Sequence, residues 1–137
     1  YYNAMAAYTR GDYRAALREF RPLAERGIAN AQYSLGLMHV NGHGVPKSYA
    51  DGLKWYRKAA LQDHSAARIG IGLLYSNGKG VPRDYVAAHM WFSLGATLGN
   101  RSAARHRDEV AEKMPDVDVA EAERRAETWL EKHGKTN

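Results

Sequence analysis

Apolar residues recur along most of the chain at intervals of three and four, the spacing that places them on one face of an α-helix. One such stripe contains Ala31, Leu35 and Met38, and Asn41-Gly42 ends it. A loop rich in glycine and proline follows, and Ser48 is placed to cap a second helix that runs to about residue 62; Asp84 holds the same position 36 residues later. No stretch alternates cleanly between apolar and polar residues, so the pattern predicts helices and no strands.

The same pattern returns after 36 residues without a gap. Residues 29–64 and 65–100 share 11 identical positions, and the match continues upstream, where Tyr13 aligns with Tyr49. The signature combines glycines of the first helix and the loop with two aromatic residues of the second helix. Its members are Gly36, Gly42, Gly44, Tyr49 and Trp55 in one repeat and Gly72, Gly78, Gly80, Tyr85 and Trp91 in the next. A repeat of this length indicates stacked two-helix units.

Each predicted pair of helices needs a neighbour. One pair cannot bury a ring as large as that of Trp55, so adjacent units are expected to stack. Gly36 and Gly72 lie inside helices, where each costs about 1 kcal/mol relative to alanine, and their recurrence predicts that another helix approaches closely there. We therefore predict an all-α fold, a right-handed α-solenoid of antiparallel helix pairs with a C-terminal capping helix.

The N-terminal end of the predicted array, residues 1–28, is a partial unit. The turn between its two helices is shorter than the loop of the full repeats. Pro22 falls inside its second helix, expected from Asp12 to about Arg26, where the proline ring clashes with the preceding turn and should kink the helix.

The C-terminal end, residues 101–137, is predicted to be another partial unit followed by the capping helix. Residues 101–113 form a first helix without the Gly-x-Gly loop. Asp118 and Glu121 then have the spacing of a capping box, which opens a helix ending near Lys132. Its apolar inner face and charged outer face suit an element that covers the last exposed core face. The whole chain is predicted to form one repeat domain.

These residues resemble the Sel1-like repeat family, which is related to the tetratricopeptide repeats but has a longer loop between its helices. The resemblance rests on the Gly-x-Gly-Val loop, the tyrosine and tryptophan after it, and Ala59-Ala60, and it covers about residues 12–113. It implies a solenoid whose first helices line a concave, peptide-binding groove. Many bacterial members are exported adaptors, so the resemblance implies a periplasmic or secreted protein whose signal peptide has been removed; a cytoplasmic location stays open.

The composition excludes several kinds of site and element. The 137 residues include no cysteine, which excludes a disulfide framework, a zinc–cysteine site and a thiol nucleophile. Hydrophobic residues make up 45% and charged residues 26%, the balance of an ordinary folded protein. No apolar run approaches the ~18 to 20 residues of a transmembrane helix. The net charge of +5 favours anionic partners without identifying one.

Motifs that could carry catalytic or metal chemistry have simpler interpretations. The Gly-x-Gly loops follow predicted helices, whereas a phosphate-binding loop follows a strand, so we interpret them as turns. His39 and His43 have the spacing of metal ligands, but Val40 stands where the metalloprotease motif has glutamate. The acidic residues are scattered, and no Gly-x-Ser-x-Gly motif is present. We therefore predict no metal, no cofactor and no enzymatic activity.

The groove is predicted from positions on the first helices that vary between repeats. They combine aromatic, basic and polar side chains, as peptide-recognition surfaces do. The predicted groove residues are Gln32, Tyr33, Val40, Arg68, Ile69, Ser76 and Arg105. The predicted function is a non-catalytic interaction module or adaptor, in a bacterial envelope or signalling context, that binds a protein or peptide in this groove.

Two alternatives stay open. One is a small enzyme that acts on cell-envelope material. The other is a binder of an anionic polymer, because Arg14, Arg18 and Arg21 form a basic stripe on one predicted helix face, although a solvated outer face also explains them. We expect no nucleic-acid partner, and the sequence leaves a weak homo-oligomer open.

Overall fold

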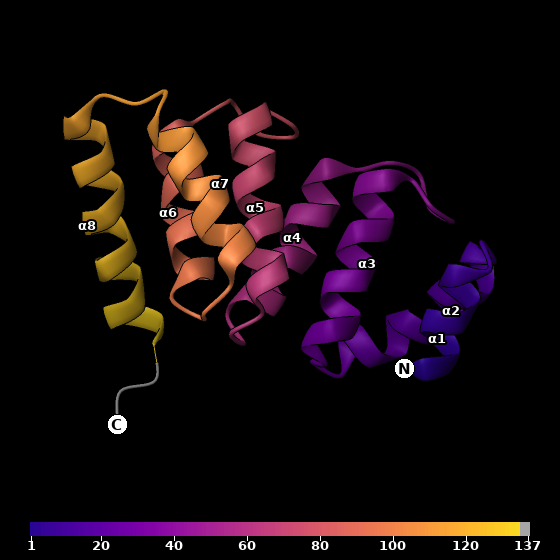
Figure 1. Ribbon diagram of the computed structural model, residues 1–137. Coiled ribbons are helices and arrows are strands. Elements are labelled where there is room, and N and C mark those ends of the chain that lie inside the picture. Colours follow the sequence, from indigo (N-terminus) through magenta and orange to yellow (C-terminus); the bar gives the residue numbers. More distant parts are fainter. Residues whose placement is uncertain (135–137) are drawn as a thin grey trace. The chain divides into compact units, whose positions relative to one another are not determined.

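The computed structural model describes residues 1–134, and every regular element in them is an α-helix (Figure 1). The last three residues of the predicted unit 101–137 lie outside the described residues. The helices are α1 (Tyr2–Thr9), α2 (Tyr13–Glu25), α3 (Ala29–Asn41), α4 (Tyr49–Ala60), α5 (Ser65–Asn77), α6 (Tyr85–Ala96), α7 (Arg101–Ala111) and α8 (Asp116–His133). Among the described helices, none combines the length and apolarity needed to cross a bilayer. The predicted all-α fold class is confirmed.

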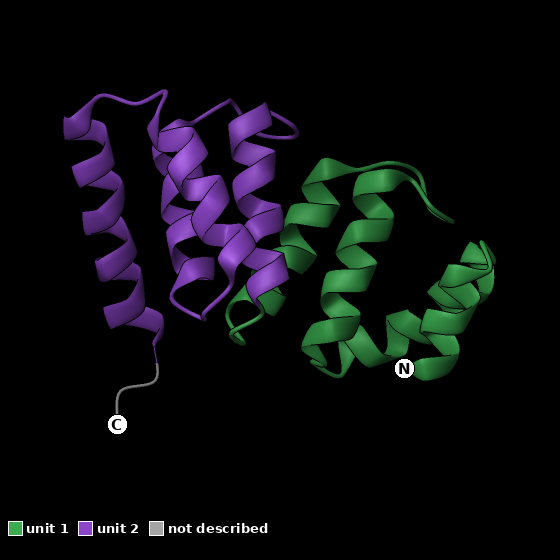
Figure 2. Ribbon diagram, in the orientation of Figure 1, with its two compact units in different colours: residues 1–64 green, residues 65–137 purple. Residues whose placement is uncertain are grey.

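The helices group into two compact units, residues 1–64 and residues 65–137 (Figure 2). In the first unit each helix packs against the next one along the chain, α1 on α2, α2 on α3 and α3 on α4. Phe20, Leu35 and Met38 form the core together with small alanines. Trp55 of α4 is half-buried and packs against this core. Its ring thus packs on a core built from α1, α2 and α3 and stays partly exposed within this unit.

In the second unit α6 is central, because α5, α7 and α8 all pack against it. The core of this unit contains Phe92, Val110 and Met114. Trp91 is only 8% exposed, and its ring meets the ring of Trp129 edge-on with centroids 5.6 Å apart. Since Trp129 belongs to α8, the last helix covers the ring of the preceding repeat. The predicted capping role of this helix is confirmed within the unit.

The loops and helix starts follow from local chemistry. The Ser48 hydroxyl accepts a hydrogen bond from the backbone N–H of Asp51, and the Asp84 carboxylate accepts one from that of Ala87. These are the predicted N-caps of α4 and α6, and each satisfies a donor that the first helical turn leaves unpaired. The loops close by backbone hydrogen bonds, such as the one from Ser48 N–H to the His39 carbonyl at 2.9 Å.

Glycine inside a helix lets a neighbouring aromatic ring approach the backbone. A Cβ atom added at Gly36 would lie 2.7 Å from a ring carbon of Tyr56, and one added at Gly72 would lie 2.4 Å from a ring carbon of Phe92. Both distances are far below van der Waals contact. The predicted close approach at these two repeat-related positions is confirmed, and in each case the approaching group is an aromatic side chain of the second helix.

The structure corrects the predicted ends of the last two helices. No capping box forms at Asp118, because α8 begins at Asp116 after Pro115 and has no side-chain cap. The carboxylate of Glu121 instead accepts hydrogen bonds from Arg124 and Arg125 on the outer surface of the same helix. The preceding helix, α7, ends at Ala111, two residues before the predicted boundary. Pro115 is the N-cap residue of α8 and has an extended backbone. Its side chain has no hydrogen-bond acceptor, so the helix begins without a side-chain cap.

Candidate functional site

A cavity of about 240 Å³ opens between α1, α2 and α3 in the first unit. We call it the N-terminal cavity. Most of its lining side chains are aromatic or aliphatic, and most of them come from α1 and α3, the first helices of their pairs. They are Tyr1, Met5, Tyr8, Phe20, Asn30, Tyr33, Ser34, Leu37 and His64. A recess of this composition favours an apolar side chain over a charged one.

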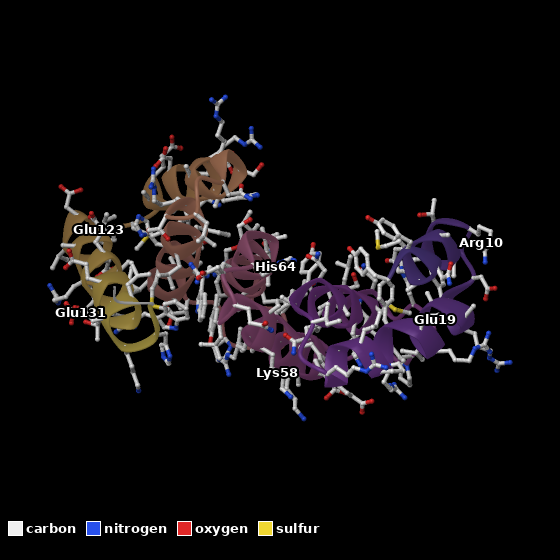
Figure 3. All side chains as sticks on the ribbon, turned by 90° about the horizontal axis from the view of Figure 1, so that it is seen from below. Arg10, Glu19, Lys58, His64, Glu123 and Glu131 are labelled. Carbon is white, nitrogen blue, oxygen red and sulfur yellow. The ribbon has the colours of Figure 1, made fainter. Side chains whose placement is uncertain are left out.

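Ring stacking and one hydrogen bond fix the wall of this cavity. Tyr33 stacks between Tyr56, with ring centroids 5.5 Å apart, and His64, with ring centroids 4.9 Å apart. The Nε2 atom of His64, a residue labelled in Figure 3, lies 2.9 Å from Oδ1 of Asn30. Burial lowers the pKa of His64 and raises the pKa of Tyr33. Both rings are therefore neutral near pH 7, which keeps this wall apolar.

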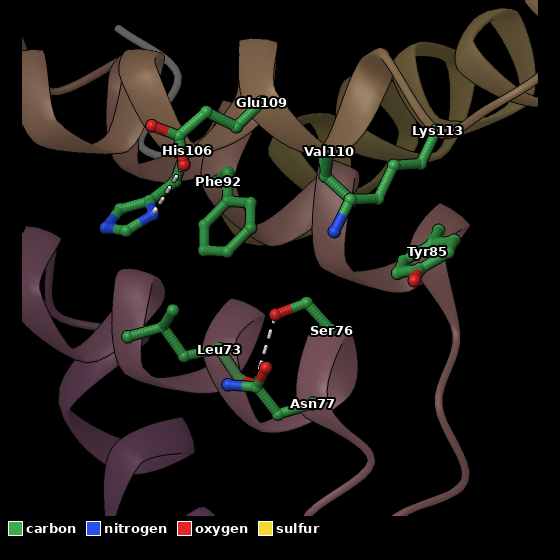
Figure 4. A pocket seen from close by; sticks show the side chains of 9 residues that line it. All are labelled: Leu73, Ser76, Asn77, Tyr85, Phe92, His106, Glu109, Val110 and Lys113. Atoms are coloured by element: carbon green, nitrogen blue, oxygen red, sulfur yellow. Dashed lines mark hydrogen bonds and ion pairs between the residues drawn. The ribbon is translucent and has the colours of Figure 1, made fainter.

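A second cavity, of about 250 Å³, lies between α5, α6 and α7 in the second unit (Figure 4). We call it the C-terminal cavity. Phe92 stacks on His106 with ring centroids 5.1 Å apart, and Nδ1 of His106 lies 4.0 Å from Oε2 of Glu109. The ammonium group of Lys113 lies 5.9 Å from the ring centroid of Tyr85. This cavity thus combines an aromatic floor with charged groups of both signs.

The two cavities use equivalent repeat positions. Leu37 and Leu73 are 36 residues apart, Phe20 and Phe92 are 72 residues apart, and one member of each pair lines each cavity. The repeat therefore builds the same kind of recess in each unit, between two first helices and above an aromatic ring. The remaining wall residues differ, so the chemistry of each recess is set separately.

Two of the seven predicted groove residues line these cavities: Tyr33 lies in the N-terminal and Ser76 in the C-terminal cavity. Gln32 is 5% exposed and does not form a groove wall. Its Nε2 donates to the Ala24 carbonyl, and its Oε1 accepts from Gln62. The prediction was wrong for Gln32 because its amide pairs with polar groups inside the unit, where a partner cannot reach it.

Arg68 is the clearest correction. It is 2% exposed, its guanidinium donates to the Leu94 carbonyl at 2.8 Å, and it lies 4.8 Å from the ring centroid of Trp129. The predicted groove role of Arg68 is wrong because the capping helix covers it. An arginine becomes a framework residue here, since a carbonyl and an aromatic face together replace its water.

The last three predicted groove residues lie outside both cavities. Val40 is half-buried and packs over Gly52, where an added Cβ would lie 2.4 Å from its side chain. Ile69 is half-buried against the core of the second unit. Arg105 is exposed and donates to Ser102 of its own helix. Sequence reasoning missed Leu37 and Leu73 because identical residues in two repeats suggest framework, although both also line a recess.

The remaining candidates for metal or anion binding are the histidines at 39 and 43 and the arginine stripe. The ring of His43 lies in a loop, stacked on Tyr13 with centroids 4.1 Å apart, and its Nδ1 lies 2.9 Å from the Tyr8 hydroxyl. Burial lowers the pKa of His39. Residues 1–134 contain no group of three or more histidine, aspartate or glutamate side chains placed to hold a metal ion. The arginine stripe of α2 is exposed at Arg14, Arg18 and Arg21.

Repeated antiparallel helix pairs, with recesses between their first helices, define a helical-repeat protein. The comparisons name the family. The Sel1 repeat model matches residues 29–64 and again residues 65–100, so the chain belongs to the Sel1 repeat family. Sel1 repeat proteins are generally protein-interaction modules. A search of curated proteins gave no significant match.

Two solved structures are similar over much of the chain. The first is c5321, described as a protective antigen present in uropathogenic Escherichia coli strains displaying an SLR fold; it is 34% identical, with a TM-score of 0.87 over 94% of this chain and 29% of its own. The second is a Sel1 repeat protein from Oxalobacter formigenes, which is 36% identical with a TM-score of 0.62 over 66% of this chain and 37% of its own. The chain therefore spans about a third of the length of these relatives.

Proposed function

We propose that this chain is a non-catalytic binding module that holds a segment of a partner protein against its first helices. The N-terminal cavity carries the proposal. Tyr8, Phe20, Tyr33 and Leu37 converge there on a recess of about 240 Å³, and a hydrogen bond and ring stacking hold its rim. The membership of a family of interaction modules supports the same conclusion.

The chemistry of the recess specifies the anchor. An apolar side chain that enters it leaves water and meets aromatic faces, and each fully buried aliphatic or aromatic side chain contributes about 1.5–3 kcal/mol. Such a residue is the kind of anchor that dominates protein interfaces. The C-terminal cavity offers Lys113 and Glu109 beside Phe92, and it therefore suits a side chain with a polar end.

Leu37→Arg is expected to weaken the binding of an apolar-anchored peptide at least tenfold. The substitution places a charge in the apolar recess, where the anchor of the partner would lie. The protein is used to select peptides from a phage-displayed random dodecamer library, and the selected peptides are measured by fluorescence anisotropy against the protein and its variants. Enrichment of peptides with an aromatic or aliphatic anchor is expected.

Leu61→Arg is the matched control, because Leu61 belongs to the same unit, is 52% exposed and does not line the cavity. Circular dichroism must show the same helical content for both variants. Equal affinities of the protein and Leu37→Arg for the selected peptides would reject the recess as the binding site. Selection of peptides without an apolar residue would reject the proposed anchor.

We further propose that the protein acts in the bacterial envelope or outside the cell. The similarity to a protein described as a protective antigen supports this location, because antibodies reach exported antigens most readily. The full-length gene fused to alkaline phosphatase, which is active only after export, should give phosphatase activity in Escherichia coli. A fusion of equal abundance without activity would place the protein in the cytoplasm.

A further inference from the structure

A third cavity, of about 530 Å³, lies between α6, α7 and α8 of the second unit. We call it the α6–α8 cavity. Its volume falls within the range of about 300–1,000 Å³ that ligand sites in proteins span. It uses a different part of α7 from the C-terminal cavity, with Arg107, Asp108 and Ala111 in its wall instead of His106, Glu109 and Val110. Neither the family assignment nor the proposed function explains it.

A buried histidine lines this cavity. His89 is 3% exposed and occupies the repeat position of Leu53, which is 8% exposed. Nδ1 of His89 lies 3.4 Å from the hydroxyl of Ser93, and no described residue hydrogen-bonds to Nε2. Replacing a buried leucine by a histidine is costly unless both ring nitrogens have partners. Nε2 of His89 is not among the buried unpaired polar atoms of residues 1–134, so it is accessible from the cavity, where a ligand can hydrogen-bond to it.

The charges around the cavity indicate the sign of that ligand. Glu123 and Glu127 lie one turn apart on α8, line the cavity, and form no ion pair with any residue in 1–134 (Figure 3 labels Glu123). Arg107 and Asp108 form an ion pair with each other at 3.0 Å, so their charges cancel. The cavity thus carries two uncompensated carboxylates, which favour a cation.

The walls indicate the shape of the ligand. Val119, Ala126 and Leu130 of α8 and Ala96 of α6 add apolar surface to the wall of the cavity beside these polar groups. A long side chain with a methylene stem and a cationic end fits this sequence of surfaces. The guanidinium of arginine has a planar set of donors that can serve two carboxylates and a ring nitrogen together, whereas an ammonium is more strongly hydrated.

We propose that the α6–α8 cavity binds an arginine side chain of a partner protein, with its guanidinium between Glu123, Glu127 and Nε2 of His89. The stem lies along Val119 and Leu130. This site is independent of the two cavities formed by the first helices, so it can succeed or fail without the proposed function.

The site also has a pH dependence with a definite sign. Burial lowers the pKa of His89, so the ring stays neutral near pH 7 and can accept a hydrogen bond. Arg107 and Asp108 face it from α7, and Glu123 and Glu127 face it from α8. When the pH falls through the lowered pKa, the ring gains a proton and repels the guanidinium. Binding is therefore expected to weaken as the pH falls.

The test is a titration of ¹⁵N-labelled protein with the blocked tripeptide acetyl-Gly-Arg-Gly-amide, followed by NMR. Its control peptide contains citrulline, which has the shape of arginine without its charge. The arginine peptide should shift amide signals of α6 and α8, and the citrulline peptide should bind at least tenfold more weakly. The double variant Glu123→Gln/Glu127→Gln should lose at least tenfold in affinity, while Glu131→Gln, an exposed control on the same helix, should not.

A His89→Leu variant separates binding from folding. It installs the residue that the preceding repeat has at this position, so its Tm should stay the same or rise by a few degrees while affinity for the arginine peptide falls. Equal binding of both peptides, signal shifts confined to other helices, or full affinity in the double glutamine variant would each overturn the proposal.

Discussion

Arg68→Ala is expected to lower the free energy of unfolding of the second unit by about 3 kcal/mol, the range for truncating a large buried side chain. The guanidinium of Arg68 connects the Leu94 carbonyl of α6 with the ring of Trp129 of α8. Its loss removes this connection and leaves a cavity under the capping helix. Urea denaturation followed by circular dichroism measures the change.

Two further variants show which property of Arg68 matters. Arg68→Met keeps most of the volume without the charge, and a buried charge replaced by an apolar side chain of similar size is often neutral. We therefore expect it to recover most of the lost stability. Arg105→Ala, at an exposed arginine bonded only within its own helix, should change stability by less than about 0.5 kcal/mol. Equal effects of Arg68→Ala and Arg105→Ala would contradict the framework role of Arg68.

Gly72→Ala is expected to lower the free energy of unfolding by about 2 kcal/mol, although alanine is the better helix former. Relief of the helical glycine contributes about 1 kcal/mol in favour of alanine. The new methyl group would lie 2.4 Å from the buried ring of Phe92, and overpacking of this kind costs about 3 kcal/mol at the upper end of its usual range. The steric cost exceeds the gain in helix propensity, so the substitution is expected to destabilise the protein. Thermal or urea denaturation measures the change in the free energy of unfolding.

A double-mutant cycle identifies the clash. Phe92→Leu removes the ring atoms that meet the added methyl group, so Gly72→Ala should cost at least 1 kcal/mol less in the Phe92→Leu background, within the usual range of about 0.5–3 kcal/mol for residues in contact. Additive effects of the two substitutions would show that the ring of Phe92 does not limit residue 72. A stabilising Gly72→Ala would show that the ring moves aside at little cost.

Much of the local structure could be predicted because it depends on residues close in sequence. Ser48 and Asp84 cap the helices that they were expected to cap, since a side-chain oxygen needs only the next turn as its partner. The glycines at 36 and 72 signalled a close approach through their recurrence. The capping box predicted at Asp118 does not form, because α8 begins earlier, directly after Pro115.

The candidate site was predicted less well because it depends on the rotation of each first helix. Successive residues on a helix differ by about 100°, so an error of one position is enough to move a residue from a groove wall to the interior. Positions 32 and 68 were expected on a groove wall and lie inside, whereas Leu37 and Leu73 line recesses. Histidines 64 and 106 come from a turn and from the next repeat, and no local pattern connects them with the recesses.

The sequence by itself determined that the chain is made of helices, where most of them begin, and that they recur as paired units of 36 residues, because periodicity and caps are local properties. The tertiary structure decided which polar residues are interior. Arg68 and His89 are polar in sequence and buried in the fold: Arg68 lies against the ring of Trp129 of α8, and His89 lines a cavity that α8 also lines, although α8 comes from a distant part of the chain. A distant helix changes the surroundings of a side chain without leaving any mark on its neighbours in sequence.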